Sequence, residues 1–310
     1  VLVNGLNGKY VQVKAHDPLM NLIGTCYGVS ADGKTAMIEM AAISGLPLVS
    51  PDQRNPLRTT SFGTGELIKD ALSRGCQEFI IGIGGSATND AGLGMLQALG
   101  FRFLDVAGNE LGLGGEIMGK VSSIDCSGAL PELQHFRFTV ACDVDNPLYG
   151  LQGAAYIYGP QKGATIHQVK EIDTGLQHFS KVVTKHIKST LENTPGAGAA
   201  GGLGYAFLSF LNGQLVSGIN RILEVIELEK EIEDADIVIT GEGRLDSQSL
   251  QGKAPIGVAR LAKKYNKKVI AIAGSVEENT TLLHEQGMTA CFSIHQQLLS
   301  LEKAMDPTIS

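Results

Sequence analysis

A glycine-rich segment at residues 84–90 carries the first set of groups that could bind a ligand. It follows the apolar run 79–83, and its candidate binding residues are Gly84, Gly85, Ser86, Thr88, Asn89 and Asp90. Glycines let the backbone approach a ligand, hydroxyls can donate hydrogen bonds, and a helix that begins after the segment directs its positive end at a bound anion. The segment predicts a phosphate or carboxylate site. The alternative is a tight turn in which Asn89 or Asp90 caps the next helix.

Charged residues follow a second apolar run, 237–240. The residues of this motif are Glu242, Arg244, Asp246, Ser247, Ser249, Gly252 and Lys253. Glu242 and Asp246 are suited to hold Mg²⁺ or to take a proton from a hydroxyl. Arg244 and Lys253 are suited to neutralise phosphate oxygens. A surface loop with a local arginine–carboxylate pair is the alternative. Charged residues beside glycines at one predicted strand end favour a functional role.

Two shorter segments add candidates. Asp143 and Asp145 leave the end of an apolar run just before a proline, where two carboxylates could bind Mg²⁺ or orient a hydroxyl. An Asx-type turn explains the same residues equally well. Lys162 lies between turn residues in 159–164 and could reach a phosphate, although a lone loop lysine is more often a solvated charge.

The elements expected to position these residues are strands that each run into a glycine turn and a helix. Residues 79–83, 237–240 and 269–273 read as buried parallel strands, and 63–74, 91–99 and 255–265 as helices. Short strands are expected at 136–142 and 154–158, and a polar helix at about 168–191. We expect 79–83, 237–240 and 269–273 to pair in one sheet. We also expect Asp90, Asp143, Glu242 and Asp246 to converge on one concavity.

This pattern predicts an α/β fold with two domains. Residues 56–100 plus 222–310 would form a domain with a Rossmann-like or flavodoxin-like parallel sheet. Residues 1–55 plus 101–221 would form a smaller mixed α/β domain. The chain begins at Val1 in what reads as a strand, and both of its ends look cut.

Composition excludes several classes of protein. The chain of 310 residues carries a net charge of −7 without a basic block, which argues against nucleic-acid binding. Its five cysteines are scattered without a C-x-x-C pair, so neither a zinc site nor a disulfide framework is expected. This use of cysteine predicts a cytoplasmic location. No apolar run reaches the roughly 18 residues of a membrane-spanning helix. The sequence leaves a homo-oligomer open.

The ordered set of motifs resembles the bacterial glycerate kinase family over essentially the whole chain. The motifs that carry the resemblance are 38–41, 58–66, 84–90, 142–148, 159–164, 196–204 and 239–253. The resemblance implies two α/β domains with the active-site cleft between them. It also implies ATP and Mg²⁺ as cofactors, D-glycerate as substrate, and 2-phosphoglycerate or 3-phosphoglycerate as product. The family's opening βα unit with Asp-Ser-Phe-Lys-Gly, its Asp-Gly-Gly-Glu-Gly turn and its closing helix are not found in this sequence.

Within that reading, Asp246 and Asp143 are the expected carboxylates, and Arg244 and Lys253 the expected phosphate ligands. Asp143, Asp145 and Glu242 are the candidate metal ligands. Gly84 to Asp90 and Lys162 are the candidate substrate or phosphate site. A kinase for another sugar acid or polyol, and a non-catalytic ligand-binding relative, are the competing interpretations.

Overall fold

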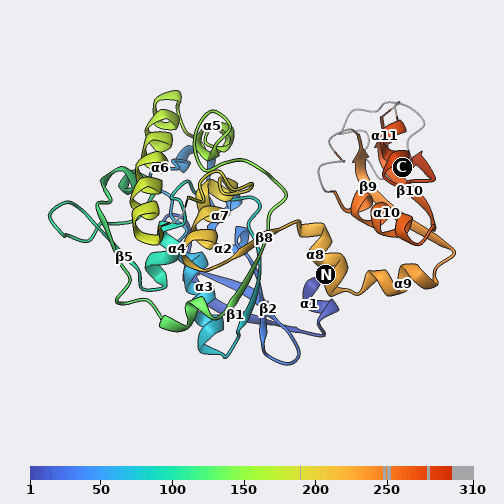
Figure 1. Cartoon of the computed structure of the whole chain (residues 1–310), viewed down its shortest axis with the longest axis horizontal. Helices are drawn as coiled ribbons and strands as arrows, with labels where there is room; N and C mark the ends of the chain where they lie inside the picture. The colour runs from blue at the N-terminus through green and yellow to red at the C-terminus, as the bar shows by residue number, and fades with distance from the viewer. Residues whose placement is uncertain (189, 247–248, 250–252, 278–279, 295–310) are drawn as a thin grey trace. The chain divides into compact units, whose positions relative to one another are not determined.

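The computed structural model describes residues 1–310 except 189, 247–248, 250–252, 278–279 and 295–310. The chain folds into two compact units, unit 1 from Val1 to Val216 and unit 2 from Ser217 to Ser310. Each unit combines helices with strands (Figure 1), so the predicted α/β class is confirmed.

Unit 1 is built on a six-stranded sheet in the order β1-β2-β3-β4-β7-β8. Its strands are β1 Lys9–His16, β2 Leu22–Val29, β3 Thr35–Glu39, β4 Glu78–Gly82, β7 Arg137–Ala141 and β8 Gln214–Val216. The first three are antiparallel neighbours, whereas β3, β4, β7 and β8 run parallel. A separate antiparallel pair consists of β5 Arg102–Leu104 and β6 Ser123–Asp125.

The parallel strands of unit 1 are apolar because helices cover them. In β4, Phe79, Ile80 and Ile81 are all buried, as expected of a central parallel strand with both faces covered. Phe79 stacks on Phe138 of β7 with ring centroids 4.7 Å apart. The strand predicted at 79–83 is therefore confirmed, and its last residue opens directly into the glycine-rich segment.

Helices and short 3-10 turns fill the connections of unit 1. The α-helices are α1 Leu2–Gly5, α2 Ala41–Ser44, α3 Phe62–Ser73, α4 Leu93–Ala98, α5 Ala154–Tyr158, α6 Ile166–Ile187 and α7 Ala199–Phe210. The 3-10 turns are η1 Leu46–Leu48, η2 Pro51–Gln53, η3 Gly115–Lys120, η4 Pro131–Gln134 and η5 Pro160–Lys162. Helix α3 packs on β1 and β3, α7 packs on β7 and β8, and α5 and α6 pack on α7 (Figure 1).

Local sequence explains the longest helix, α6. Thr165 and Gln168 form a capping box at its start, with the Thr165 side chain accepting from the Gln168 amide. Five apolar residues at spacings of three and four are buried along one stripe: Val169, Ile172, Leu176, Phe179 and Val183. The predicted polar helix at 168–191 is confirmed in this region.

Two local predictions for unit 1 are wrong. Residues 154–158 form the helix α5 instead of a strand, because a short apolar run fits either element and here it packs on two helices. The chain opens with the helix α1 at Leu2–Gly5, and the first strand begins only at Lys9.

Unit 2 has a parallel three-stranded sheet in the order β11-β10-β9. Its strands are β9 Ile237–Leu245, β10 Lys268–Val276 and β11 Ala290–Ser293, and its helices are α8 Gly218–Val225, α9 Leu228–Asp234, α10 Ala254–Lys264 and α11 Thr281–Glu285. Ile256, Ala259 and Leu283 of α10 and α11 join Val269 and Ala271 of β10 in the core.

The strand pairing corrects the expected single sheet. β9 and β10 are parallel neighbours, as predicted, with Val238 opposite Val269. The strand at 79–83, however, belongs to the other sheet, between β3 and β7. Two strand–turn–helix segments of the same design need not share a sheet, because an apolar run specifies burial and leaves the hydrogen-bonding partner unspecified.

The observed units also differ from the expected division into 56–100 plus 222–310 and 1–55 plus 101–221. Residues 1–216 form one continuous unit, because 56–100 supply β4 and its flanking helices to the same sheet as β1–β3 and β7. The second part, 222–310, lies within unit 2.

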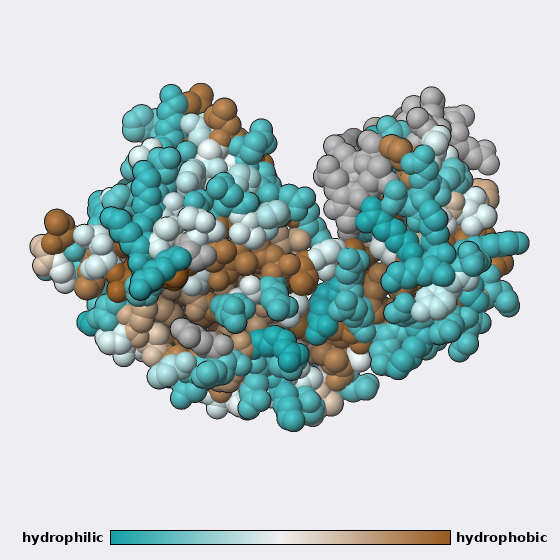
Figure 2. Space-filling model, in the orientation of Figure 1, coloured by the Kyte–Doolittle hydropathy of each residue, from teal (hydrophilic) through white to brown (hydrophobic). Residues whose placement is uncertain are grey.

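The described helices include none with the length and apolar character needed to cross a membrane. Figure 2 shows a largely hydrophilic outer surface on both units, with hydrophobic side chains gathered toward the middle of the visible face of unit 1.

Candidate functional site

The carboxyl ends of the parallel strands of unit 1 bring several predicted residues to one edge of the sheet. Glu39 of β3 lies opposite Gly82 of β4, and Gly82 opposite Ala141 of β7. Gly84 and Asp143 follow two residues beyond these partners, so both leave the same edge on neighbouring strands. Ligands of α/β sheets bind outside the carboxyl ends of strands.

The 84–86 turn presents backbone donors at this edge. Gly84 and Gly85 are exposed, and Gly85 has φ +73°, in the left-handed region. The amides of Gly84, Gly85 and Ser86 donate to no acceptor among the described residues. The Gly85 and Ala87 backbones are fixed by Leu46, whose amide donates to Gly85, and by Ser44, whose carbonyl accepts from Ala87. Successive amides around a left-handed residue form a concavity that suits an anion.

The rest of the 84–90 segment faces inward. Thr88 is 1% exposed, and Asn89 and Asp90 are fully buried. The Thr59 hydroxyl donates to the Ala87 carbonyl at 2.9 Å. Substrate groups at the exposed turn would therefore meet Gly84, Gly85 and the edge of Ser86 before any of these residues.

Asp90 anchors the segment. Its Oδ2 accepts from the amide and the hydroxyl of Ser61, both at 2.8 Å, and from the Gly94 amide at 3.3 Å, while Oδ1 accepts from the Gly92 amide at 3.2 Å. Burial raises the pKa of Asp90, and the hydrogen bonds from Ser61, Gly94 and Gly92 oppose that rise. The N-cap of α4 is Gly92 and has no side-chain cap bond, so the alternative in which Asn89 or Asp90 caps this helix is wrong. Asp90 instead accepts from the Gly92 amide and from the second amide of the helix, that of Gly94.

Lys162 lies beneath the segment and is 2% exposed. Its Nζ donates to Ser86 Oγ at 2.7 Å, to the Thr88 carbonyl at 2.6 Å and to Asn89 Oδ1 at 3.1 Å. Burial lowers the pKa of Lys162 to about 7, and the negative charge of Asp90 opposes that shift. The alternative interpretation of Lys162 as a solvated loop lysine is therefore excluded.

The glycines of the 196–204 motif also serve this segment. A Cβ on Gly201 would collide with the Thr88 carbonyl, and one on Gly202 with Ala91. The Ala91 amide donates to the Gly201 carbonyl at 3.0 Å. These glycines allow α7 to approach the loop closely.

Asp143 and Asp145 are exposed just beyond β7. Asn146 shapes their segment, because its Nδ2 donates to the Gln152 carbonyl at 2.8 Å and its Oδ1 accepts from the Tyr158 hydroxyl at 2.6 Å. The two carboxylates thus stand at the same sheet edge as the 84–86 turn.

Unit 2 gathers the second motif around Asp246. Asp246 Oδ1 accepts from the amide and the hydroxyl of Ser249, both at 3.0 Å, and Oδ2 lies 3.1 Å from Arg244 Nε. Lys253 Nζ lies 4.0 Å from Oδ1 and donates to the Arg244 carbonyl at 3.0 Å. Partial burial acts to raise the pKa of Asp246, but the Ser249 hydrogen bonds and the two cations outweigh it and lower the pKa.

Arg244 is the most exposed member of this cluster, with 67% of its side chain accessible against 12% for Asp246. A phosphate could therefore draw Arg244 away and leave Asp246 Oδ2 open to a metal or hydroxyl. Glu242 is half-buried and accepts from its neighbour, the Gly243 amide, at 3.0 Å. Ser247 and Gly252 of the same motif lie outside the described residues.

The predicted residues thus form two groups, one per unit. In unit 1, Lys162 donates to Ser86, Thr88 and Asn89, and the charge of Asp90 acts on it. In unit 2, Asp246 lies close to Arg244 and Lys253. The convergence of Asp90, Asp143, Glu242 and Asp246 on one concavity stays a prediction. Asp90 itself is turned into internal hydrogen bonds.

Across the described residues no group of three or more His, Cys, Asp or Glu side chains is placed to hold a metal ion. A Mg²⁺ ion that is bound mainly through water and substrate phosphates needs only one or two carboxylates. The exposed oxygens of Asp143 and Asp145 have the donor chemistry for that arrangement.

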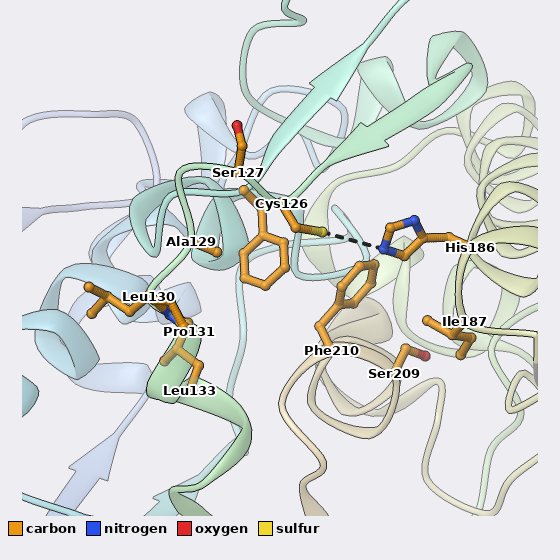
Figure 3. A pocket seen from close by; sticks show the side chains of 11 residues that line it. Cys126, Ser127, Ala129, Leu130, Pro131, Leu133, His186, Ile187, Ser209 and Phe210 are labelled. Carbon is orange, nitrogen blue, oxygen red and sulfur yellow. Dashed lines mark hydrogen bonds between the residues drawn. The ribbon is translucent and has the colours of Figure 1, made fainter.

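A cavity of about 400 Å³ lies elsewhere in unit 1 (Figure 3). It is lined by Phe101, Cys126, Ser127, Ala129, Leu130, Pro131, Leu133, His186, Ile187, Ser209 and Phe210. Cys126 Sγ lies 3.3 Å from His186 Nε2, and burial raises the pKa of this thiol. None of the sequence-predicted residues lines the cavity.

Two residues near the 84–90 segment were not predicted from the sequence. Glu39 is exposed at the carboxyl end of β3 beside the glycine turn, and its position after an apolar run was the available signal. Ser61 binds Asp90 from a segment 29 residues away in the chain, and no local pattern announces that contact.

Comparisons with known proteins agree on one family. The model of the glycerate kinase family matches residues 1–309. A glycerate kinase of Bacillus subtilis is 49% identical over 305 residues, 98% of this chain and 80% of that protein. A glycerate 2-kinase of Escherichia coli is 50% identical over 287 residues, 93% of this chain and 75% of that protein. A crystal structure from Salmonella typhimurium LT2, described provisionally as glycerate kinase 2, has a TM-score of 0.87 and 46% identity, and covers 98% of this chain and 79% of that one. The chain belongs to the glycerate kinase family.

Proposed function

We propose that this protein transfers the γ-phosphoryl group of ATP to the C2 hydroxyl of D-glycerate and releases 2-phosphoglycerate and ADP. The oxygen of the hydroxyl forms the new bond to phosphorus, the bond between the γ-phosphorus and its bridging oxygen breaks, and the hydroxyl proton passes to a carboxylate. The near 50% identity to a glycerate 2-kinase supports the position of transfer.

One observation carries the binding part of this proposal. The amides of Gly84, Gly85 and Ser86 have no acceptor among the described residues and lie at the carboxyl edge of the sheet. Glycerate carries a carboxylate and ATP carries phosphates, and both are anions that such a turn can bind. We assign the 84–86 turn to the substrate carboxylate or a phosphate group.

The charged cluster of unit 2 supplies the second part. Arg244 and Lys253 would neutralise phosphate oxygens during transfer, as cations do in phosphoryl-transfer sites. Asp246 is held ionised by Ser249, Lys253 and Arg244, so at neutral pH it can accept a hydrogen bond or a proton from the attacking hydroxyl. Asp143 is the other candidate for that role.

We propose that Mg²⁺ takes its carboxylate oxygens from Asp143 and Asp145 in unit 1 or from Glu242 in unit 2. When bound, the ion would neutralise the charge that develops on the phosphate oxygens. The protein's own part is to fix those carboxylates at strand ends. In unit 1, Asp143 and Asp145 leave the same edge of the sheet as the 84–86 turn.

Phosphorus NMR of the reaction of ATP, D-glycerate and Mg²⁺ with this protein tests the proposal. A resonance of 2-phosphoglycerate that grows as ATP is converted to ADP is expected. The 3-phosphate as sole product would overturn the position of transfer, and turnover of another sugar acid or a polyol but not glycerate would overturn the substrate. Tight binding of glycerate and ATP without turnover would favour a non-catalytic relative.

We also propose a cytoplasmic location. All five cysteines are free thiols, which suits a reducing compartment. Fractionation of the native cell with an antibody against this chain, compared with a periplasmic marker, tests the location. A homo-oligomer is a further proposal, for which the mass in solution by light scattering is the test.

A further inference from the structure

Lys162 holds three acceptors from the candidate anion-binding segment with the three N–H groups of one ammonium. The acceptors are Ser86 Oγ, the Thr88 carbonyl and Asn89 Oδ1, at 2.6–3.1 Å. The side chain is 2% exposed, so no solvent competes for these bonds. A buried charge is tolerated when it is hydrogen-bonded and paired, and Asp90 supplies nearby negative charge.

The bond to Ser86 fixes the direction of the Ser86 hydroxyl. Because Ser86 Oγ accepts from Lys162, its own proton must point away from Nζ. This hydroxyl finds no acceptor among the described residues, and Ser86 adjoins the exposed Gly84 and Gly85. A hydroxyl that accepts from a cation is also a stronger donor, since hydrogen bonds in a chain polarise one another.

We propose that Lys162 is a positioning residue that does not touch substrate: it holds the 84–90 segment from beneath and turns the Ser86 hydroxyl, together with the amides of Gly84, Gly85 and Ser86, toward the anionic group of the substrate. This inference rests on the proposed function of the 84–86 turn. It changes the role expected of Lys162 from the sequence, which was direct contact with a phosphate.

The contact pattern explains why the lysine is buried. A lysine that bound substrate directly would need a free N–H and a path to it, whereas all three N–H groups of Lys162 are used internally. The Lys162 ammonium donates to the Thr88 carbonyl in place of a backbone amide, and this bond helps to hold the turn in its position. Two elements therefore fix the turn that follows β4. Lys162 belongs to η5, and Gly201 of α7 lies close to the Thr88 carbonyl.

A double-mutant cycle on the full chain tests the inference at pH 6, where Lys162 carries its proton. Lys162→Met keeps the length of the side chain and removes its donors. We expect a roughly 10- to 100-fold increase in the KM for D-glycerate or in the Kd for inorganic phosphate, the equivalent of one hydrogen bond to a charged group. Ser86→Ala should produce part of the same loss, and the two changes together should cost less than the product of the single effects.

A matched control separates positioning from loss of stability. Phe179→Leu alters a buried residue of α6 that packs on Phe103, with ring centroids 5.7 Å apart, and it should lower the melting temperature without changing the KM or the phosphate affinity. If Lys162→Met behaves as Phe179→Leu does, the inference is overturned. Independent effects of Lys162→Met and Ser86→Ala would overturn the route through Ser86.

Phosphate binding measured by calorimetry keeps the inference apart from the proposed reaction. Wild-type protein that binds phosphate but turns over no glycerate would contradict the proposed function and still support the inference, provided Ser86→Ala weakens the phosphate. Wild-type protein that binds neither anion would overturn the inference. If Lys162→Met does not fold, Ser86→Ala alone must weaken phosphate binding, and unchanged binding overturns the inference.

Discussion

The two glycine-rich strand ends look alike in sequence and differ in what they leave accessible. In unit 1 the charges are turned inward: Asp90 and Lys162 are buried, and the exposed part of the segment is backbone. In unit 2 the charges face outward, and Arg244 has 67% of its side chain exposed. Burial, which a motif does not reveal, decides whether a strand end offers neutral hydrogen-bond donors or charged side chains.

This difference favours different roles for the two strand ends. A turn of backbone amides fits one anion geometrically and adds no net charge, so it suits recognition of a carboxylate or a phosphate already in place. Mobile exposed cations suit oxygens whose charge changes during transfer.

The largest expected effect is on turnover at the outward-facing end. Asp246→Asn keeps the size of the side chain but cannot take a proton and binds Mg²⁺ poorly, so kcat should fall by roughly 10²–10⁴-fold, the range for a general base. The KM for ATP should change little. Steady-state kinetics measures kcat and KM, and a thermal melt shows whether the variant is folded. Normal turnover in a folded variant would exclude Asp246 as the general base and leave Asp143 as the candidate.

A large loss of stability is expected at the inward-facing end. Asp90→Ala removes the acceptor of the Ser61 amide and hydroxyl and the negative charge near Lys162. The free energy of unfolding should therefore fall by about 3–5 kcal/mol, the range for the removal of one partner from a buried ion pair. Urea unfolding followed by circular dichroism is suitable, since the chain has no tryptophan.

Asp105→Ala is the control for that loss. Asp105 also accepts from two backbone amides, those of Ala107 and Asn109 at 2.8 and 2.9 Å, but in an exposed turn where water can replace it. A loss for Asp90→Ala no greater than for Asp105→Ala would contradict the buried-anchor account.

A smaller effect is expected from Arg244→Ala. Removal of an exposed cation should raise the KM for ATP roughly 10- to 100-fold, the equivalent of one hydrogen bond to a charged group, and should leave the melting temperature almost unchanged. Lys264→Ala, an exposed cation on α10 near Glu229, is the control and should change neither quantity. A lower melting temperature with unaltered nucleotide affinity would make Arg244 a structural partner of Asp246.

The last expected effect is a pH dependence of stability that arises from Lys162. Its pKa is lowered by burial to about 7, against about 10.4 in the unfolded chain. Between these values the unfolded chain binds more protons, so the contribution of Lys162 to stability rises with pH and its penalty is complete below about pH 7.

Urea unfolding of the wild type and Lys162→Met at pH 6.5 and 9.5 measures this contribution. The wild type should gain stability relative to the variant at the higher pH. An equal difference at both values would mean that Lys162 titrates alike in the folded and unfolded chains. Asp90 is the titratable group whose charge acts on Lys162, and it is present in both proteins.

Most local elements could be predicted from the sequence, although 154–158 is a helix and not the expected strand. The partners of the strands within the sheets could not be predicted. The apolar run at 79–83 and the capped helix α6 were predictable because period and caps are local signals. The sheet that each strand joins was not, since β4 pairs with β3 and β7 through contacts 40 to 60 residues distant.

The candidate site shows the same limit. Residue type identified Arg244, Asp246 and the 84–90 segment as places for anion chemistry, and the structure clusters them within each unit. Whether Asp90 and Lys162 face solvent depends on Ser61 and on the close approach of Gly201, which are distant in the chain. Accessibility is a tertiary property, so it could not be read from the motifs.

The most direct measurement is nitrogen-15 NMR of the Gly84, Gly85 and Ser86 amides during titration with D-glycerate and, separately, with ATP. The account predicts that at least one of these anions shifts all three amide resonances with a single dissociation constant, and that Arg244→Ala leaves the shifts by D-glycerate intact. Saturation of a catalytically active protein with both ligands, with these three resonances unmoved, would contradict it.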